Sequence, residues 1–335
     1  MGLSLRDVTE VTAPSPKQRQ ILTELLGDKS TRPEFDPLLA VELRERLETE
    51  LAEIAADLTE RDRLVVSKYD LQNVHACEGL YAGKLYEQFE WSVQNTRGRI
   101  VHRGVQRQIV SGYAYEPLDL AGQALTQFIE EDDLYGPSEF LRNLDPGARE
   151  DLVSDAADAL TKFLMDWPPI QRSWRPRVES AVGAPLCGGR IELRGRVDLA
   201  LGAPEGSRAN VFIVDFKTGR ENDHHIQDAR FYALIETLAR GTPPYRVATY
   251  YLDSGTYRSE DVTIDVLEVA IRRTVAGARA MHRIQTEKDH RPELRPNPLC
   301  RFCPSLPDCE PGKAHNARRG GDLGDLDDLL ERDDG

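Results

Sequence analysis

The chain is poor in cysteine and in long apolar segments, and both shortages exclude classes of protein. Five cysteines in 335 residues are too few for the disulfide scaffold of a small secreted domain. No run of 18 apolar residues occurs, so the sequence predicts no transmembrane helix and no membrane partner. The first residues lack a basic segment followed by an apolar one, so we expect no secretory leader and a cytoplasmic protein.

The chain also lacks net positive charge, since its formal net charge is −14. The distribution is uneven, however, and matters more than the sum. Residues 116–158 carry twelve acids and two arginines, whereas residues 97–107 carry four arginines and no acid. The stretch QRSWRPR at 171–177 holds three arginines beside a tryptophan and a proline. A basic cleft on an acidic body is compatible with this pattern, although these arginines could equally solvate a helix face.

No phosphate-binding loop of an ATPase is visible. Residues 79–85, GLYAGKL, contain a Gly-Lys pair, but they lack the G-x4-GK[ST] spacing and follow no predicted strand. Any helicase or ATPase activity would therefore come from a separate partner.

Hydrophobic periodicity predicts an α/β protein. Residues 1–37 contain four prolines that break any long helix. Apolar residues at helical or alternating spacing follow. The predicted helices cover 38–58, a segment starting at the N-cap Ser67, 98–110, an acidic helical insert at about 117–166, 224–241 and 265–285. The predicted strands cover 177–183, 191–202, 210–219 and 245–255.

This order of elements predicts three parts. An N-terminal helical extension covers residues 1–66, and a domain with a mixed central sheet flanked by helices covers 67–312. Residues 313–335 are rich in Gly, Asp and Arg, which predicts a disordered tail.

An acid and a lysine end one predicted strand, in the stretch IVDFKTG at 213–219. Side chains at i and i+2 lie on one face of a strand, so Asp215 and Lys217 project together while Phe216 faces the other side. Alone, these two residues could be a surface ion pair that contributes little to the stability of the fold. Asp198, in GRVDLAL on the preceding strand, adds a second carboxylate, and two such carboxylates can hold Mg²⁺. The ion would lower the pKa of a bound water, and Lys217 would polarise that water or stabilise the transition state.

Two further residues are candidate ligands. His102, in GRIVH, lies between arginines, where a metal-bound or phosphate-binding imidazole is expected. Glu179, in RVESAV on the strand before Asp198, is a tentative extra metal ligand or simply an exposed strand residue.

Three cysteines are concentrated in ten residues. Cys300, Cys303 and Cys309 form a C-x2-C-x5-C pattern with prolines that force turns. The candidates for a fourth ligand are Cys77, Cys187, His290 and His315. Four thiolates suit zinc or an iron–sulfur cluster, and spacing alone does not separate the two.

The ordered motifs resemble the RecB-type nucleases of the PD-(D/E)xK superfamily, in the branch that carries an iron–sulfur cluster. That branch includes CRISPR-associated exonucleases and the cluster-bearing nuclease domain of the AddAB helicase–nuclease. Its pattern is a lone cysteine, then G-x3-H, G-x-x-D, D-x-K, Q-x3-Y and C-x2-C-x5-C. The matching residues between 67 and 310 are Cys77, His102, Asp198, Asp215, Lys217, Cys300, Cys303 and Cys309.

The resemblance implies a restriction-endonuclease-like fold and a metal-dependent DNA nuclease, in particular an exonuclease that hydrolyses phosphodiester bonds. It implies that Mg²⁺ or Mn²⁺ is held by His102, Asp198, Asp215 and the carbonyl of Phe216. It also implies a [4Fe-4S] cluster on the four cysteines named above, with Zn²⁺ as the alternative. The expected DNA contacts are Arg99, Arg103, Arg107, Gln227, Arg230 and Tyr232.

One motif departs from the pattern. Gln227 lies five residues before Tyr232, so Asp228 takes the position of the glutamine in Q-x3-Y. This departure favours an alternative, a non-catalytic DNA-binding or scaffolding subunit of a DNA repair or defence complex. A zinc-dependent binding module is a second alternative, but it leaves the strand acids unexplained.

Overall fold

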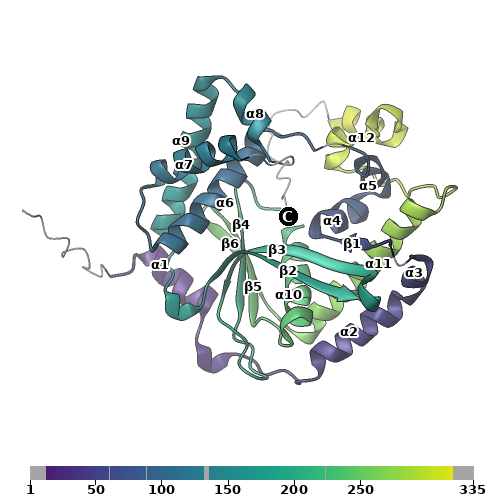
Figure 1. The fold of residues 1–335 in the computed structure, drawn as a ribbon, viewed down its shortest axis with the longest axis horizontal. Helices are drawn as coiled ribbons and strands as arrows, with labels where there is room; N and C mark the ends of the chain where they lie inside the picture. The colour runs from purple at the N-terminus through teal and green to yellow at the C-terminus, as the bar shows by residue number, and fades with distance from the viewer. Residues whose placement is uncertain (1–12, 60, 88, 132–135, 223, 320–335) are drawn as a thin grey trace, which may run out of the picture.

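A mixed sheet with helices on both faces forms the centre of the computed structural model (Figure 1). The structure describes residues 13–59, 61–87, 89–131, 136–222 and 224–319. The strands are β1 (Leu64–Val66), β2 (Arg177–Leu186), β3 (Ile191–Leu201), β4 (Phe212–Lys217), β5 (Arg246–Tyr251) and β6 (Thr256–Asp261). Within these described ranges, no helix has the length and apolar character needed to cross a membrane. The predicted α/β class, with a mixed central sheet flanked by helices, is confirmed.

The pairing of β3 creates an opening in the sheet. β2 pairs antiparallel with β3 along one edge. On the other edge, β1 pairs in parallel with residues 191–193, and β4 pairs antiparallel with residues 199–201. The stretch of β3 between these two ladders, which includes Asp198, therefore has neither β1 nor β4 as a ladder partner. β5 and β6 extend the sheet beyond β4.

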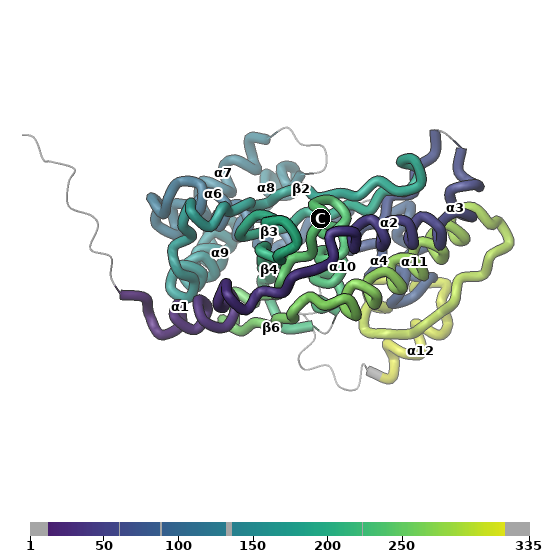
Figure 2. Tube along the Cα trace, turned by 90° about the horizontal axis from the view of Figure 1, so that it is seen from below, coloured from purple at the N-terminus to yellow at the C-terminus, as the bar shows by residue number. Residues whose placement is uncertain are grey.

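Helices cover the two faces with separate apolar cores. The first core contains buried residues of α2 (Leu39–Glu50), α4 (Lys68–Ala76), α10 (His225–Arg240) and α11 (Ile264–Thr286). The second contains residues of α6 (Val93–Ser111), α7 (Pro117–Glu130) and α9 (Pro146–Asp166), and in it Phe216 packs edge to face against Phe163 and Trp167. Figure 2 shows α6 to α9 at one end of an elongated molecule and α3 with α12 at the other.

The remaining helices are α1 (Pro16–Gln20), α3 (Ala52–Asp57), α5 (Glu78–Lys84), α8 (Ser138–Asn143) and α12 (Glu310–Arg319), with a π-helical turn at Ile21–Leu26. The predicted N-cap Ser67 forms a capping box with Asp70, which satisfies free N–H groups at the start of α4. Gly241 ends α10 in the left-handed conformation with φ 83°, a common helix stop.

The structure differs from the sequence prediction at both ends. Residues 16–26 are helical rather than irregular, because Pro16 stands at the first helical position and Ser15 and Gln18 form a capping box. β1 lies inside the predicted 1–66 extension, so the sheet begins earlier than expected. Residues 313–319 of the predicted disordered tail belong to α12, whereas 320–335 and 1–12 lie outside the described residues.

Candidate active site

Two neighbouring strands bring Asp198 and Asp215 together at the opening beside β3. The register pairs Leu199 with Val214, so the two aspartates occupy the next facing positions of an antiparallel pair. The backbone N–H of Phe216 donates to Oδ2 of Asp198 over 2.6 Å. That bond ties the orientation of one carboxylate to the strand that carries the other. Asp198 is 8% exposed and Asp215 only 2%.

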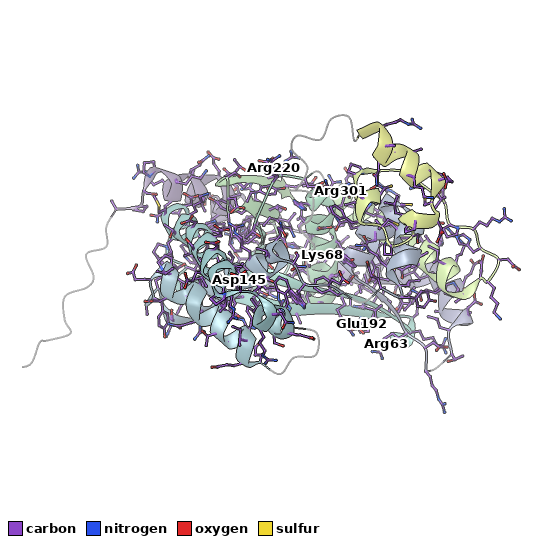
Figure 3. The ribbon with its side chains drawn as sticks, turned by 90° about the horizontal axis from the view of Figure 1, so that it is seen from above. Arg63, Lys68, Asp145, Glu192, Arg220 and Arg301 are labelled. Atoms are coloured by element: carbon purple, nitrogen blue, oxygen red, sulfur yellow. The ribbon has the colours of Figure 1, made fainter. Side chains whose placement is uncertain are left out.

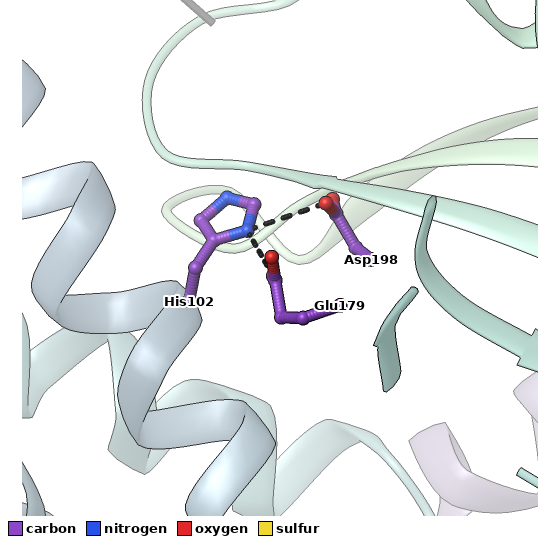
Figure 4. A group of neighbouring side chains, drawn as sticks. All are labelled: His102, Glu179 and Asp198. Atoms are coloured by element: carbon purple, nitrogen blue, oxygen red, sulfur yellow. Dashed lines mark hydrogen bonds and ion pairs between the residues drawn. The ribbon is translucent and has the colours of Figure 1, made fainter. Parts of the chain in front are cut away.

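Helix α6 adds a histidine to the carboxylates (Figure 4). Nδ1 of His102 lies 3.1 Å from Oε1 of Glu179 and 3.4 Å from Oδ1 of Asp198. One ligand atom from each of these three residues falls within 4.8 Å of the others. The predicted alternative for Glu179, an exposed strand residue, is wrong, since its carboxylate faces His102 and is only 13% exposed.

The backbone of Glu179 is unusual. Its φ is +46°, a left-handed conformation that is rare for a residue other than glycine in a strand. Val178 and Ser180 on either side keep their pairing with Leu199 and Val197 of β3. Strained backbone of this kind collects at functional sites, and here it places the Glu179 carboxylate opposite Asp198 and beside His102.

Asp215 lies between two lysines. Nζ of Lys217 is 2.9 Å from its Oδ2, and Nζ of Lys68 is 3.6 Å from its Oδ1. The three residues are at most 5% exposed, so the alternative of a solvated surface ion pair is excluded. Lys68, at the start of α4, is near the middle of the molecule in Figure 3. It reaches the site because β1 ends beside Leu193 of β3 and α4 begins next to the opening.

Charge and burial oppose each other throughout the site. Burial alone would raise the pKa of Asp215, but the two lysines outweigh it and hold that pKa well below its usual value. Burial likewise disfavours the charged form of His102, yet Asp198 and Glu179 raise the pKa of this imidazole well above its usual value. For Asp198 burial prevails, and its pKa is raised.

The altered motif on α10 faces the same cluster. Asp228 is 5% exposed, and burial raises its pKa to about 6 against the attraction of Lys68 and Lys217. Tyr232 is also buried, and Nζ of Lys68 lies 5.3 Å from the centre of its ring. Lys68 is thus in reach of Asp215, Asp228 and Tyr232 together, a role that its position after a helix cap does not reveal from sequence.

The predicted DNA-contact arginines fall into two groups. Burial raises the pKa of the Glu179 carboxyl, but His102 outweighs burial and lowers that pKa, with smaller contributions from Arg196 and Arg99. Arg103 pairs with Glu131 over 3.1 Å, Arg107 donates to Gln127 over 3.4 Å, and Arg230 pairs with Glu260 over 2.6 Å. The last three bind partners on other elements, and Gln227 is half-buried one residue before Asp228.

The structure brings Cys77, Cys300, Cys303 and Cys309 to one cavity of about 220 Å³ between α5 and α12. Backbone N–H groups of Arg295 and Asn297 donate to the sulfurs of Cys77 and Cys300 over 3.4 and 3.3 Å.

The other candidate ligands lie elsewhere. Cys187 contacts Glu48, and His290 bonds to Glu78. His315 is on α12 but does not line the cavity. All five cysteines are free thiols.

The site residues fit a hard divalent cation. Such ions prefer carboxylate oxygen and accept imidazole nitrogen, and Glu179, Asp198 and His102 supply these within 4.8 Å. Oδ2 of Asp215 is already paired with Nζ of Lys217 over 2.9 Å, so the fit to a cation rests on the other three residues.

Comparisons with known proteins identify a family for the chain. No curated protein matches the chain. Among solved structures, a candidate exonuclease of Eubacterium rectale is similar over 84% of this chain and 93% of its own, with 12% identity and a TM-score of 0.44. The protein SSO0001 is similar over 82% and 96%, with 13% identity and a TM-score of 0.33. The profile of the PD-(D/E)XK nuclease superfamily matches residues 65–310, so the chain belongs to this superfamily of metal-dependent nucleases.

Proposed function

We propose that the chain is a Mg²⁺- or Mn²⁺-dependent deoxyribonuclease that hydrolyses phosphodiester bonds from DNA ends. One observation carries the proposal: His102, Glu179 and Asp198 converge within 4.8 Å, directly beside the buried Asp215–Lys217 pair. The end-directed activity rests on the resemblance of the ordered motifs to RecB-type exonucleases.

In this proposal His102, Asp198, Asp215 and the Phe216 carbonyl hold the ion, and Glu179 is a further ligand. A bound ion supplies a water of lowered pKa and positive charge beside the phosphate. Lys217 donates a charged N–H to the attacked phosphate or the attacking water, where it stabilises developing negative charge. Lys68 fixes Asp215 from its other side, and the Phe216 N–H fixes Asp198.

The test is a cleavage assay on end-labelled linear DNA and on covalently closed circular DNA, with Mg²⁺, Mn²⁺ or EDTA. We expect cleavage of the linear substrate only, loss of cleavage in EDTA, and at least 100-fold slower cleavage by Asp198→Asn. Glu192→Gln, on the same strand but paired with Arg63, is the matched control and keeps full activity. If the wild type binds DNA but never cuts it, the chain is the non-catalytic subunit instead.

We also propose that the four cysteines around the cavity hold a [4Fe-4S] cluster rather than one Zn²⁺. The four cysteines line one cavity of about 220 Å³, and the preference for a cluster over zinc rests on the resemblance of the ordered motifs to the cluster-bearing nucleases. The N–H groups aimed at Cys77 and Cys300 are of the kind that tune cluster sulfurs.

Anaerobic purification tests the cluster through iron, sulfide and zinc content and absorbance near 400 nm. We expect about four iron atoms per chain and their loss in Cys300→Ser. Cys187→Ser is the matched control, because Cys187 lies outside the cavity, and it keeps the iron. Stoichiometric zinc in a colourless protein refutes the cluster.

Five free thiols suit the cytoplasm, where thiols stay reduced, and we propose that location. Unwinding of duplex DNA would require a separate helicase, which we propose as a partner.

A further inference from the structure

A second cavity, of about 420 Å³, lies where β3 ends and β5 begins, and none of the candidate metal ligands lines it. Its walls come from the N-terminal segment before α2, the turn at 173–175, the end of β3 and the start of β5. Asn210, which lines it, precedes Asp215 by five residues of extended chain, or about 17 Å at 3.3 Å per residue. The cavity therefore does not overlap the metal ligands.

The polar groups of this cavity are mainly cationic. Lys29, Arg32 and Arg175 line it with a single acid, Glu205, in a chain whose net charge is −14. Lys29 and Arg175 are exposed, whereas Arg32 is half-buried. Three cations against one acid favour an anionic ligand in the cavity.

The other walls are flat and apolar. The half-buried Trp174 lines the cavity together with Tyr245. The guanidinium of Arg32 stacks on the Tyr245 ring, with its central carbon 4.2 Å from the ring centre, and it also donates to the side chain of Asn210. Such stacked arginines and exposed indole faces bind planar rings and phosphates.

The backbone that presents Trp174 is fixed. The N–H of Gly202 donates to the Trp174 carbonyl over 2.6 Å. Gly202 has φ +100°, and a Cβ there would lie 2.0 Å from the Asn210 carbonyl oxygen, so only glycine fits. Arg175 follows in a left-handed conformation with φ +50°. The wall is therefore built before any ligand binds.

From these features we infer that the cavity binds a nucleoside 5′-phosphate. Its volume is in the range of small-ligand pockets, about 300–1,000 Å³. Trp174 stacks on the base, the cationic side chains of Lys29, Arg32 and Arg175 bind the phosphate, and Glu205 accepts from the sugar hydroxyls. The site uses Trp174 and Arg175 of the basic, aromatic stretch at 171–177.

Titration calorimetry with AMP in EDTA tests the inference without any nuclease activity. Adenosine and inorganic phosphate are separate probes for the two halves of the ligand. We expect AMP to bind at least tenfold more tightly than either probe. Trp174→Leu should weaken AMP binding about 5- to 150-fold, the range for loss of a base–aromatic stack. Lys29→Gln, at an exposed position, should weaken AMP and phosphate alike.

Arg172→Gln is the matched control, since Arg172 neighbours the turn but does not line the cavity, and it should bind AMP as the wild type does. All three variants should keep wild-type nuclease activity, which shows that they fold. The inference is overturned if AMP gives no binding, if Trp174→Leu binds it unchanged, or if phosphate binds as tightly as AMP.

Discussion

Lys68 offers the sharpest test of the electrostatic design of the site, through Lys68→Met alone and combined with Asp228→Asn. Its Nζ lies 3.6 Å from Oδ1 of Asp215, which corresponds to about 4–5 kcal/mol of attraction at an effective dielectric constant of about 20. Methionine removes this attraction and leaves Asp215 and Asp228 buried with one cation instead of two. Breaking a buried pair by removing one partner costs about 3–5 kcal/mol, so we expect the free energy of unfolding of Lys68→Met to fall by that amount.

The second substitution removes one of the two acids that Lys68 compensates. Asp228→Asn in the Lys68→Met background returns the site to its original net charge, so we expect it to recover about 1–3 kcal/mol, within the range of coupling between neighbouring residues. Urea unfolding of the metal-free protein, followed by circular dichroism, measures both effects. Lys162→Met, at an exposed position, is the control and should change stability by less than about 0.5 kcal/mol.

Two results would refute this reasoning. A loss below about 1 kcal/mol in Lys68→Met would mean that its charge is not coupled to Asp215. A double variant no more stable than the single one would mean that Asp228 is not part of the same charge balance. The nuclease assay adds a functional measure: Lys68→Met should cleave DNA more slowly than the wild type, and the double variant should cleave it faster than Lys68→Met.

The remaining predictions concern charge and pH. Because burial raises the pKa of Asp228 to about 6, the folded state favours its protonated form. As pH rises from about 4 to above 6, the free energy of unfolding of the wild type should fall by up to about 3 kcal/mol relative to that of Asp228→Asn. Unfolding curves of the two proteins that show no such difference contradict this. Burial opposes the charged form of His102, but Asp198 and Glu179 raise its pKa, so a metal ion and a proton compete for the imidazole. Mn²⁺ binding measured by calorimetry should therefore tighten with rising pH. His102→Asn should bind Mn²⁺ more weakly and with a flatter pH dependence. Lys217→Met should cut at least 100-fold more slowly with an unchanged circular dichroism spectrum, and near-normal cleavage would remove Lys217 from the mechanism.

The sequence predicts the strand acids but not their complete surroundings. Asp198, Asp215 and Lys217 could be placed on one face because strand alternation and a hairpin-length loop fix their relation locally. Lys68 could not be placed beside Asp215 from the sequence. The two residues lie on α4 and β4, which come together because β1, just before α4, and β4 pair with the same edge of β3. β6 escaped prediction because TYRSED is polar and mostly exposed. α1 escaped because Pro16 starts a helix as readily as it breaks one.

The topology explains why so many charges can be buried at one point. A continuous ladder on both edges of β3 would cover the stretch around Asp198 with backbone. Instead β1 stops beside Leu193 and β4 joins at Leu199, so the side chains of α4, α6 and α10 reach the gap. Four acids (Glu179, Asp198, Asp215 and Asp228) then face two lysines (Lys68 and Lys217). When His102 is neutral, as a metal ligand has to be, the six charged side chains sum to −2, which one divalent cation would neutralise. The opening that interrupts the sheet thus gathers the charges that such a cation would balance.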